Sequence, residues 1–165
     1  MPDFLSIEIT GADALRAELA NALNQLQNPC ELMVHLGALL EANIQQRFER
    51  RRDPDDQRWD TLADSTKAGY ARQDKGARRG SLLQRTGQMR NSLAANAGAD
   101  YVEVGMHRVT TGGAWSIPLL HETGTTRMPR RGIFLADPTA GTLGKGDEAD
   151  LQVELVAFMD GLFGG

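Results

Sequence analysis

The first apolar pattern along this chain is an alternation: residues 5–9 read LSIEI, with apolar and polar side chains in turn. A period of two is typical of a strand with one buried face. The same period returns at Tyr101–Met106, which reads YVEVGM. The sequence therefore predicts two short strands that lie far apart along the chain.

Helical spacing dominates elsewhere. Leucines recur at every third or fourth position over residues 11–26, and a similar apolar pattern covers residues 147–162. The strongest pattern covers residues 29–51, with apolar positions at Leu32, Leu36, Leu39, Leu40, Ile44 and Phe48. Such spacing places apolar side chains on one helix face, so three amphipathic helices are predicted. A fourth, short helix is predicted with Asp64 or Ser65 as its N-cap.

Glycine and polar residues mark the connections. The stretches near 73–81 and 108–114 are rich in both, so these loops are predicted to be mobile. Residues 115–122 are expected to begin as a strand or a short helix, and residues 133–135 are expected to form a short buried element.

These elements do not alternate as repeated strand–helix–strand units. We therefore expect an α+β fold in which a small antiparallel β-sheet packs against the long helix and two further helices. With 165 residues, the chain suits one domain that spans residues 1–165.

Charge is distributed unevenly along the chain. Residues 1–46 hold one basic residue against six acids, residues 47–131 hold sixteen against ten, and residues 132–165 hold one against six. Such a layout suits head-to-tail self-association, in which a basic surface meets an acidic one. Alternatively, the basic middle is simply a solvated, loop-rich region.

Little in the sequence suggests catalysis. The three histidines, His35, His107 and His121, are not spaced as metal ligands, and the chain has no nucleophile-elbow or phosphate-loop motif. Its one cysteine, Cys30, excludes an internal disulfide and is interpreted as structural. We therefore expect no enzyme activity, no metal and no cofactor.

Nucleic-acid binding is the alternative class of function. Basic residues that can contact phosphates gather in the middle of the chain: Arg47, Arg50, Arg51, Arg52, Lys75, Arg78 and Arg79. Aspartates are interleaved with them, and no aromatic stacking pattern accompanies them. A small nucleic-acid-associated packaging or regulatory factor is therefore the second hypothesis.

Two turn-rich motifs carry the most specific signal. The first motif, residues 82–93, reads LLQRTGQMRNSL, and the second motif, residues 119–135, reads LLHETGTTRMPRRGIFL. Both mix glycine and threonine with apolar anchors, a composition that builds tight turns and supplies no nucleophile. The residues interpreted as turn formers are Thr86, Gly87, Glu122, Gly124, Thr125 and Pro129. Gly124 is expected to be required, because its turn needs a positive φ or a close backbone approach.

In this order, with YVEVGM between them, the two motifs resemble the phage virion morphogenesis and tail-completion proteins of Mu-like and P2-like phages. They also resemble the related minor tail components of siphophages. Further matching positions are an Asp-Pro turn followed by Trp59 and Leu62, a Val-x-Val-Gly strand at Val102–Gly105, and Met128-Pro129-x-Arg131.

The resemblance implies a structural virion protein that completes the head-proximal end of a tail, or forms part of the neck, and enables head–tail joining. Such proteins work as closed homo-oligomeric rings, here a hexamer or alternatively a dodecamer. The implied neighbours are tail-tube, terminator or head-connector proteins. DNA can pass through such a ring without sequence-specific binding, and no membrane is involved. The implied location is the tail or neck of the virion, after synthesis in the cytoplasm of the host bacterium.

Four arginines are expected to contact an adjacent subunit or a neck partner. Arg130 and Arg131 follow a turn that fixes their direction, and Arg78 and Arg79 lie in a basic loop. The alternative for the Arg130–Arg131 pair is a solvated position on the surface.

Overall fold

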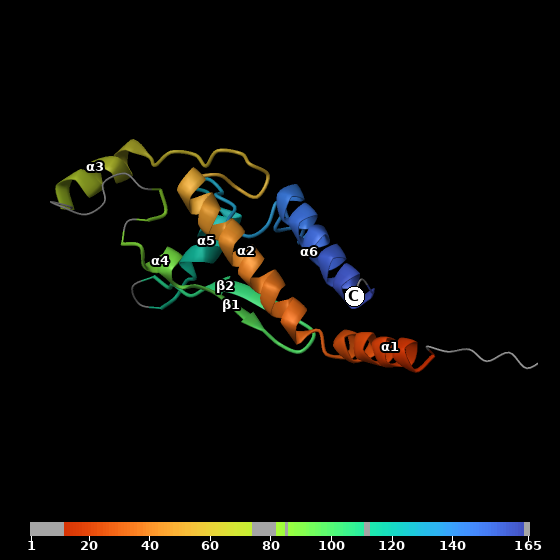
Figure 1. Ribbon diagram of the computed structural model, residues 1–165. Coiled ribbons are helices and arrows are strands. Elements are labelled where there is room, and N and C mark those ends of the chain that lie inside the picture. Colours follow the sequence, from red (N-terminus) through yellow and green to blue (C-terminus); the bar gives the residue numbers. More distant parts are fainter. Residues whose placement is uncertain (1–11, 74–81, 85, 111–112, 164–165) are drawn as a thin grey trace, which may run out of the picture.

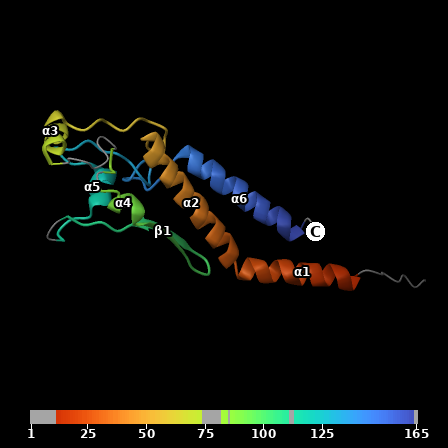
Figure 2. The ribbon, with the colours of Figure 1, turned by 60° about the vertical axis from the view of Figure 1, so that its left-hand side comes forward.

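The computed structural model describes residues 12–73, 82–84, 86–110 and 113–163. Its helices and strands, in chain order, are α1 (Ala12–Gln27), α2 (Cys30–Arg50), α3 (Asp64–Gln73), α4 (Gln88–Asn91), β1 (Leu93–Ala97), β2 (Val102–Met106), α5 (Ile117–Thr123) and α6 (Lys145–Phe163). Helix α2 runs through the middle, with the β1–β2 hairpin on one side and α6 on the other (Figure 1, Figure 2). The α+β class predicted from the sequence is confirmed.

Helix α2 lies directly on the hairpin because one of its positions has no side chain. A Cβ at Gly37 would lie 2.9 Å from Cγ2 of Val102 and 3.1 Å from Cβ of Ala95. Farther along the same helix, Ile44 and Phe48 are buried, as their spacing of four residues predicts. A helix and a two-stranded sheet thus share one apolar layer.

The C-terminal end of α2 is capped by the backbone and by a side chain. Arg51 adopts a left-handed φ of 58°, and its N–H bonds the carbonyl of Arg47. The carbonyl of Phe48 accepts a hydrogen bond at 3.0 Å from the side-chain amide of Gln84, which belongs to the first motif. The first motif is therefore anchored to the end of the long helix.

Strands β1 and β2 are antiparallel, paired from Leu93 with Met106 to Ala97 with Val102. The strand predicted at residues 101–106 is confirmed to within one residue. The sequence did not predict β1, because LAANA has no β-branched or aromatic residue and no clear alternation. The strand predicted at residues 5–9 lies outside the described residues.

The remaining elements agree with their predicted positions. Helices α1 and α6 begin and end within two residues of the predicted bounds. Helix α3 begins at Asp64, so its N-cap is Ala63 and not the predicted Asp64 or Ser65. The open choice at residues 115–122 is decided in favour of a helix, α5. Of the loops near 73–81 and 108–114, residues 74–81 and 111–112 lie outside the described residues, and the mobility of both loops stays a prediction. Within the described ranges, no helix is long and apolar enough to cross a membrane.

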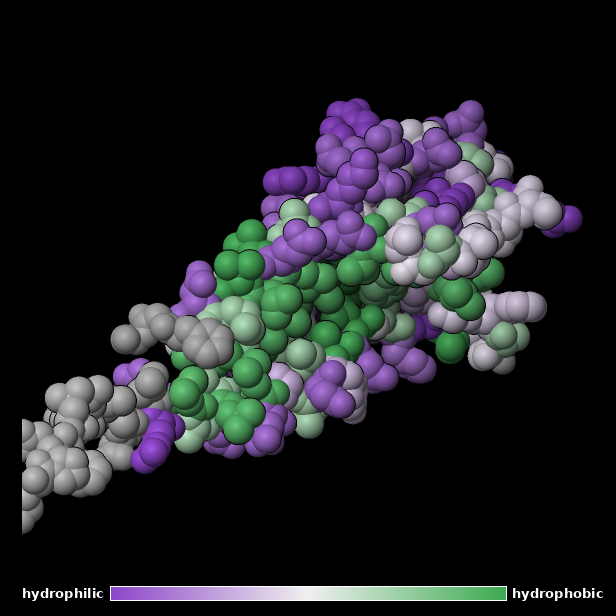
Figure 3. Space-filling view, turned by 90° about the vertical axis from the view of Figure 1, so that its right-hand side faces the viewer, coloured by the Kyte–Doolittle hydropathy of each residue, from purple (hydrophilic) through white to green (hydrophobic). Residues whose placement is uncertain are grey.

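Helices α1 and α6 leave much of their apolar surface uncovered. On α1, Leu19, Leu23 and Leu26 are all exposed. On α6, Val153 and Val156 are exposed as well. The side of the molecule where these two helices lie shows a continuous hydrophobic surface (Figure 3).

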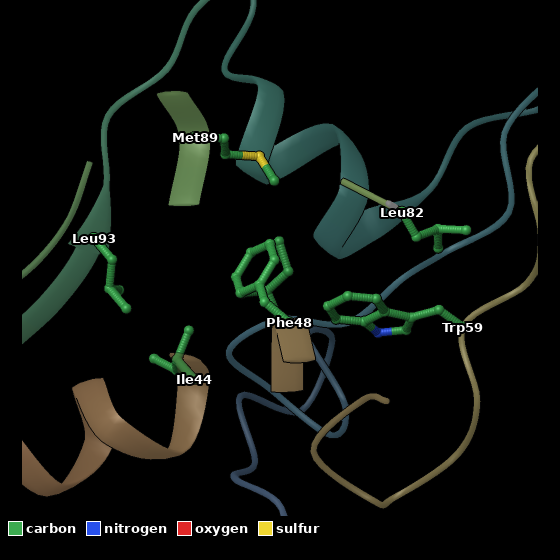
Figure 4. Close-up of a cluster of buried hydrophobic side chains, with 7 residues drawn as sticks. Ile44, Phe48, Trp59, Leu82, Met89 and Leu93 are labelled. Carbon is green, nitrogen blue, oxygen red and sulfur yellow. The ribbon is translucent and has the colours of Figure 1, made fainter. Parts of the chain in front are cut away.

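One hydrophobic core joins the second half of α2 to loops from later parts of the chain. Its buried members are Ile44, Phe48, Trp59, Leu82, Met89, Leu93 and Ile133 (Figure 4). The rings of Phe48 and Trp59 meet edge to face, with centroids 5.5 Å apart and planes at 77°. Ile133 is fully buried, as expected for the short element at residues 133–135, although its backbone is irregular.

Candidate functional site

The second motif reverses direction after α5. Thr125 and Met128 exchange two backbone hydrogen bonds in a tight turn. The N–H of Arg131 then reaches the carbonyl of His121 at 2.8 Å. The chain after the turn, residues 130–135, therefore runs back beside α5, and we call it the returning segment.

A buried carboxylate holds the returning segment in place. Glu122, in the last turn of α5, is 6% exposed. Its Oε2 accepts hydrogen bonds from the N–H groups of Ile133 at 2.6 Å and Phe134 at 3.0 Å. Its Oε1 accepts from the N–H of Leu135 at 3.0 Å and lies 3.4 Å from Nη2 of Arg130. A buried charge is tolerated when its acceptor sites are filled in this way.

Two of the three arginines of the second motif, Arg130 and Arg131, bind groups within the chain. Nε of Arg130 donates to the carbonyl of Glu122 at 2.9 Å. Arg131 is 3% exposed, and it donates to the carbonyls of Asp60 and Thr61 at 2.9 and 3.0 Å. Arg131 is therefore neither a solvated residue nor accessible to a neighbouring subunit. For Arg131 the structure corrects both expectations, because burial and these carbonyl acceptors give it a role inside the fold. For Arg130, whose side chain is 31% exposed, a contact with a neighbouring subunit stays a prediction.

The other two arginines expected at an interface, Arg78 and Arg79, lie outside the described residues. A contact with a subunit or a neck partner stays a prediction for them.

Two further side chains hold the returning segment from the opposite side. Nε1 of Trp59 donates to the carbonyl of Gly132 at 3.0 Å, and Nη1 of Arg47 donates to the carbonyl of Ile133 at 2.7 Å. Arg47 is also ion-paired with Asp147 of α6, and both side chains are buried. Helix α2, helix α6 and the second motif are thereby joined through one polar network.

The sequence did not predict this network. Arg47 was grouped with residues available to nucleic-acid phosphates, yet it is 8% exposed. The signal that could have placed it inside is its position on the apolar face, three residues after Ile44. Of its neighbours, Arg52 pairs with Asp56 at 3.0 Å. Lys75, Arg78 and Arg79 lie outside the described residues.

Gly124 meets both conditions that were expected to make it necessary. Its φ is 72°, a left-handed conformation that favours glycine. A Cβ at this position would lie 2.9 Å from the backbone nitrogen of Arg130 and 3.2 Å from the carbonyl oxygen of Met128. Of the other turn residues, Thr125 bonds in the turn through its backbone, and Pro129 is exposed beside it.

The first motif contains the turn expected at Thr86 and Gly87. Gly87 has a φ of 73° directly before α4, and its carbonyl accepts a hydrogen bond from the N–H of Asn91 at 2.9 Å. The side-chain oxygen of Thr86 lies 3.4 Å from the N–H of Gln88. This short helix places Met89 in the core, so these motif residues also shape the fold.

The local pair His121–Glu122 is not arranged for catalysis. Both carboxylate oxygens of Glu122 are bonded to the backbone of the returning segment, so neither can act as a base towards a substrate. Nδ1 of His121 is buried without a hydrogen-bond partner among the described residues. Among all the residues that the structure describes, no three histidine, cysteine or acidic side chains gather as metal ligands.

Acid is expected to destabilise the protein through His121. Burial, together with the nearby charge of Arg131, lowers the pKa of His121 from 6.5 to about 4. Below pH 6.5 the unfolded chain therefore takes up a proton that the folded chain refuses until about pH 4. Stability should fall across this window by on the order of 2 kcal/mol from this residue, since the imidazole keeps some solvent contact.

Urea unfolding at pH 7 and at pH 4.5 measures this effect. In His121→Gln, the free energy of unfolding should differ clearly less between the two pH values than it does in wild type. In His107→Gln, a substitution on the surface, this difference should be the same as in wild type. Equal pH dependence in wild type and His121→Gln would show that His121 is not the source.

The comparisons with known proteins agree with the resemblance found in the motifs. A family model described as the phage virion morphogenesis family matches residues 11–134. This range includes the first motif, the hairpin and all but the last residue of the second motif, and it ends before α6. Neither the curated proteins nor the solved structures contain a match to the chain.

Proposed function

Because this chain belongs to the phage virion morphogenesis family, we propose that it completes the head-proximal end of a phage tail, or forms part of the neck, and enables head–tail joining. Family membership supports a role in the structure or assembly of a virion, and we propose no catalytic role for the chain. We further propose that it acts in the tail or neck as a closed ring of identical subunits, a hexamer or alternatively a dodecamer. Its neighbours would be tail-tube, terminator or head-connector proteins.

The observation that carries the proposal is the use of Glu122. The one carboxylate of the second motif accepts hydrogen bonds from three backbone N–H groups of the returning segment. Such a carboxylate fixes the path of the largely buried returning segment, and with it the exposed turn at residues 125–127, and it offers no reactive group to a substrate. A motif built to hold a shape suits a protein whose task is to present an interface.

Deletion of the gene from its phage tests the proposal. Electron microscopy of the lysate should show DNA-filled heads and finished tails that remain separate, because a joining interface is missing and no earlier step fails. Supplying the wild-type gene in trans should restore joined particles. A lysate with joined, infectious virions, or one that lacks tails or heads altogether, would overturn the proposal.

A further inference from the structure

Helix α6 has two apolar sides, and this chain covers one of them. The side that faces α2 carries the half-buried Phe158, which lines a hollow with His35 of α2, and Asp147 and Glu154, which contact Arg47 and His35. On the far side, Val153 and Val156 are 70% and 57% exposed, followed by Leu155 and Met159. A helix that is apolar on two sides is typically buried on both, so a covering partner is expected.

Helix α1 extends this uncovered surface. Leu19, Leu23 and Leu26 are all exposed, although their spacing is that of a core-facing stripe, and Ala22 beside them is buried. Helix α1 contacts α6, and the two helices share one hydrophobic surface with a hollow in it (Figure 3). We call it the α1–α6 face, and its residues are Leu19, Leu23, Leu26, Val153, Leu155, Val156 and Met159.

A second exposed apolar feature lies in the hairpin loop before α5. Trp115 is 65% exposed, and Leu119 and Val109 are exposed near it. The N–H of Thr110 bonds the carbonyl of Trp115 at 2.9 Å, and Ser116 caps α5. We call Val109, Trp115 and Leu119 the Trp115 ridge. Exposed tryptophan is rare on free surfaces and is enriched among residues that dominate binding energy.

The two surfaces differ in charge and in place. Helix α6 holds one lysine against five acids, and Glu148 and Asp160 are exposed on its far side. Of the four arginines in residues 107–131, which include the ridge, Arg131 is buried and Arg130 pairs with Glu122, the one acid, which is also buried. The exposed Arg127 and the half-buried Arg108 therefore supply positive charge with no exposed acid beside it in this range. The ridge lies by α5, towards the end of the molecule opposite to α1 (Figure 1, Figure 2).

From this complementarity we infer that the Trp115 ridge of one copy docks onto the α1–α6 face of the next copy. A head-to-tail contact needs two different, matching surfaces on one chain. The Trp115 ridge and the α1–α6 face are both apolar, and they differ in charge and in their place on the molecule. Opposite charge also orients the two copies and speeds their encounter. The inference rests on the proposed ring and adds the surfaces that would build it. Helix α6 lies beyond the matched range 11–134, so its share of the α1–α6 face belongs to the C-terminal part of the chain that the family model does not match.

Sedimentation of the purified full chain tests the contact. Wild type should assemble at about 100 µM. Trp115→Ala, or the double variant Val153→Lys/Val156→Lys, should raise the dissociation constant about 30-fold or more. The matched controls are Tyr101→Ala, an exposed aromatic residue elsewhere, and Ala68→Lys, an exposed position of α3. Both controls should assemble as wild type does.

Mixing the two variants gives the sharper result. Trp115→Ala keeps an intact α1–α6 face, and the double variant keeps an intact ridge. An equimolar mixture should therefore form a 1:1 heterodimer that grows no further. A monomeric wild type, normal assembly of Trp115→Ala, or no heterodimer overturns the inference. Loss of assembly in the double variant alone would instead indicate a two-fold contact or another partner, which also overturns it.

The failure of this contact and the failure of the proposed function are distinguishable. A chain that stays monomeric in solution but still joins heads to tails refutes the contact alone. A chain that assembles through these surfaces, but whose deletion leaves virions joined, refutes the proposed function and leaves the contact in place.

Discussion

Replacing Glu122 by glutamine is expected to lower the free energy of unfolding by about 3 kcal/mol. The carboxylate accepts from the N–H groups of Ile133, Phe134 and Leu135, with donors on both of its oxygens. A glutamine amide turns one of these oxygens into a donor, which then faces a buried backbone N–H. At this chain length, the loss corresponds to a fall in Tm of about 6–12 °C.

Thermal unfolding followed by circular dichroism measures the change. The matched control is Glu49→Gln, since Glu49 pairs with Arg90 at 2.8 Å but is 63% exposed. This control should lower the free energy of unfolding by less than about 1 kcal/mol. If both variants lose equally little stability, Glu122 does not hold the returning segment as described.

Gly124→Val should destabilise the protein by about 3 kcal/mol or more. Valine at a φ of 72° is strained, and its Cβ would lie 2.9 Å from the backbone nitrogen of Arg130. The nearest atoms belong to the backbone of Arg130 and Met128 and not to a flexible side chain, so the turn and the returning segment must shift. We therefore expect this variant to fail in head–tail joining as well as in stability.

Gly105→Val is the matched control, because Gly105 lies in β2 and a Cβ added there would meet no atom within 4 Å. It should be stable and functional. His121→Ala should also support joining, since we assign His121 no catalytic role. Joined particles with Gly124→Val and none with His121→Ala would reverse the ranking and favour a catalytic site at His121.

Local periodicity was enough to predict the elements with strong patterns. Helix α2 repeats its apolar residues along its whole length, and β2 alternates valines with polar residues, so both were placed within one or two residues. Strand β1 has no such pattern, because alanine carries little preference for strands. Its pairing with β2 is fixed by the close approach of α2 at Gly37, which only the folded chain reveals.

The polar network could not be predicted from the sequence, for a different reason. The acceptors of Arg131 are backbone carbonyls of Asp60 and Thr61, which lie far earlier in the chain. Backbone carbonyls carry no signature in the sequence, so an arginine that binds them looks like any surface arginine. Gly124 was predictable because the demand on it is local, a turn with positive φ.

The most direct test of the central claim is complementation in vitro. A lysate of the phage that lacks this gene would be mixed with the purified protein, and joined particles would be counted by plaque titre and electron microscopy. We predict that wild-type protein and His121→Ala restore infectious, joined virions, and that Gly124→Val does not. Separate heads and tails that stay separate after addition of folded wild-type protein would contradict the proposed role in joining.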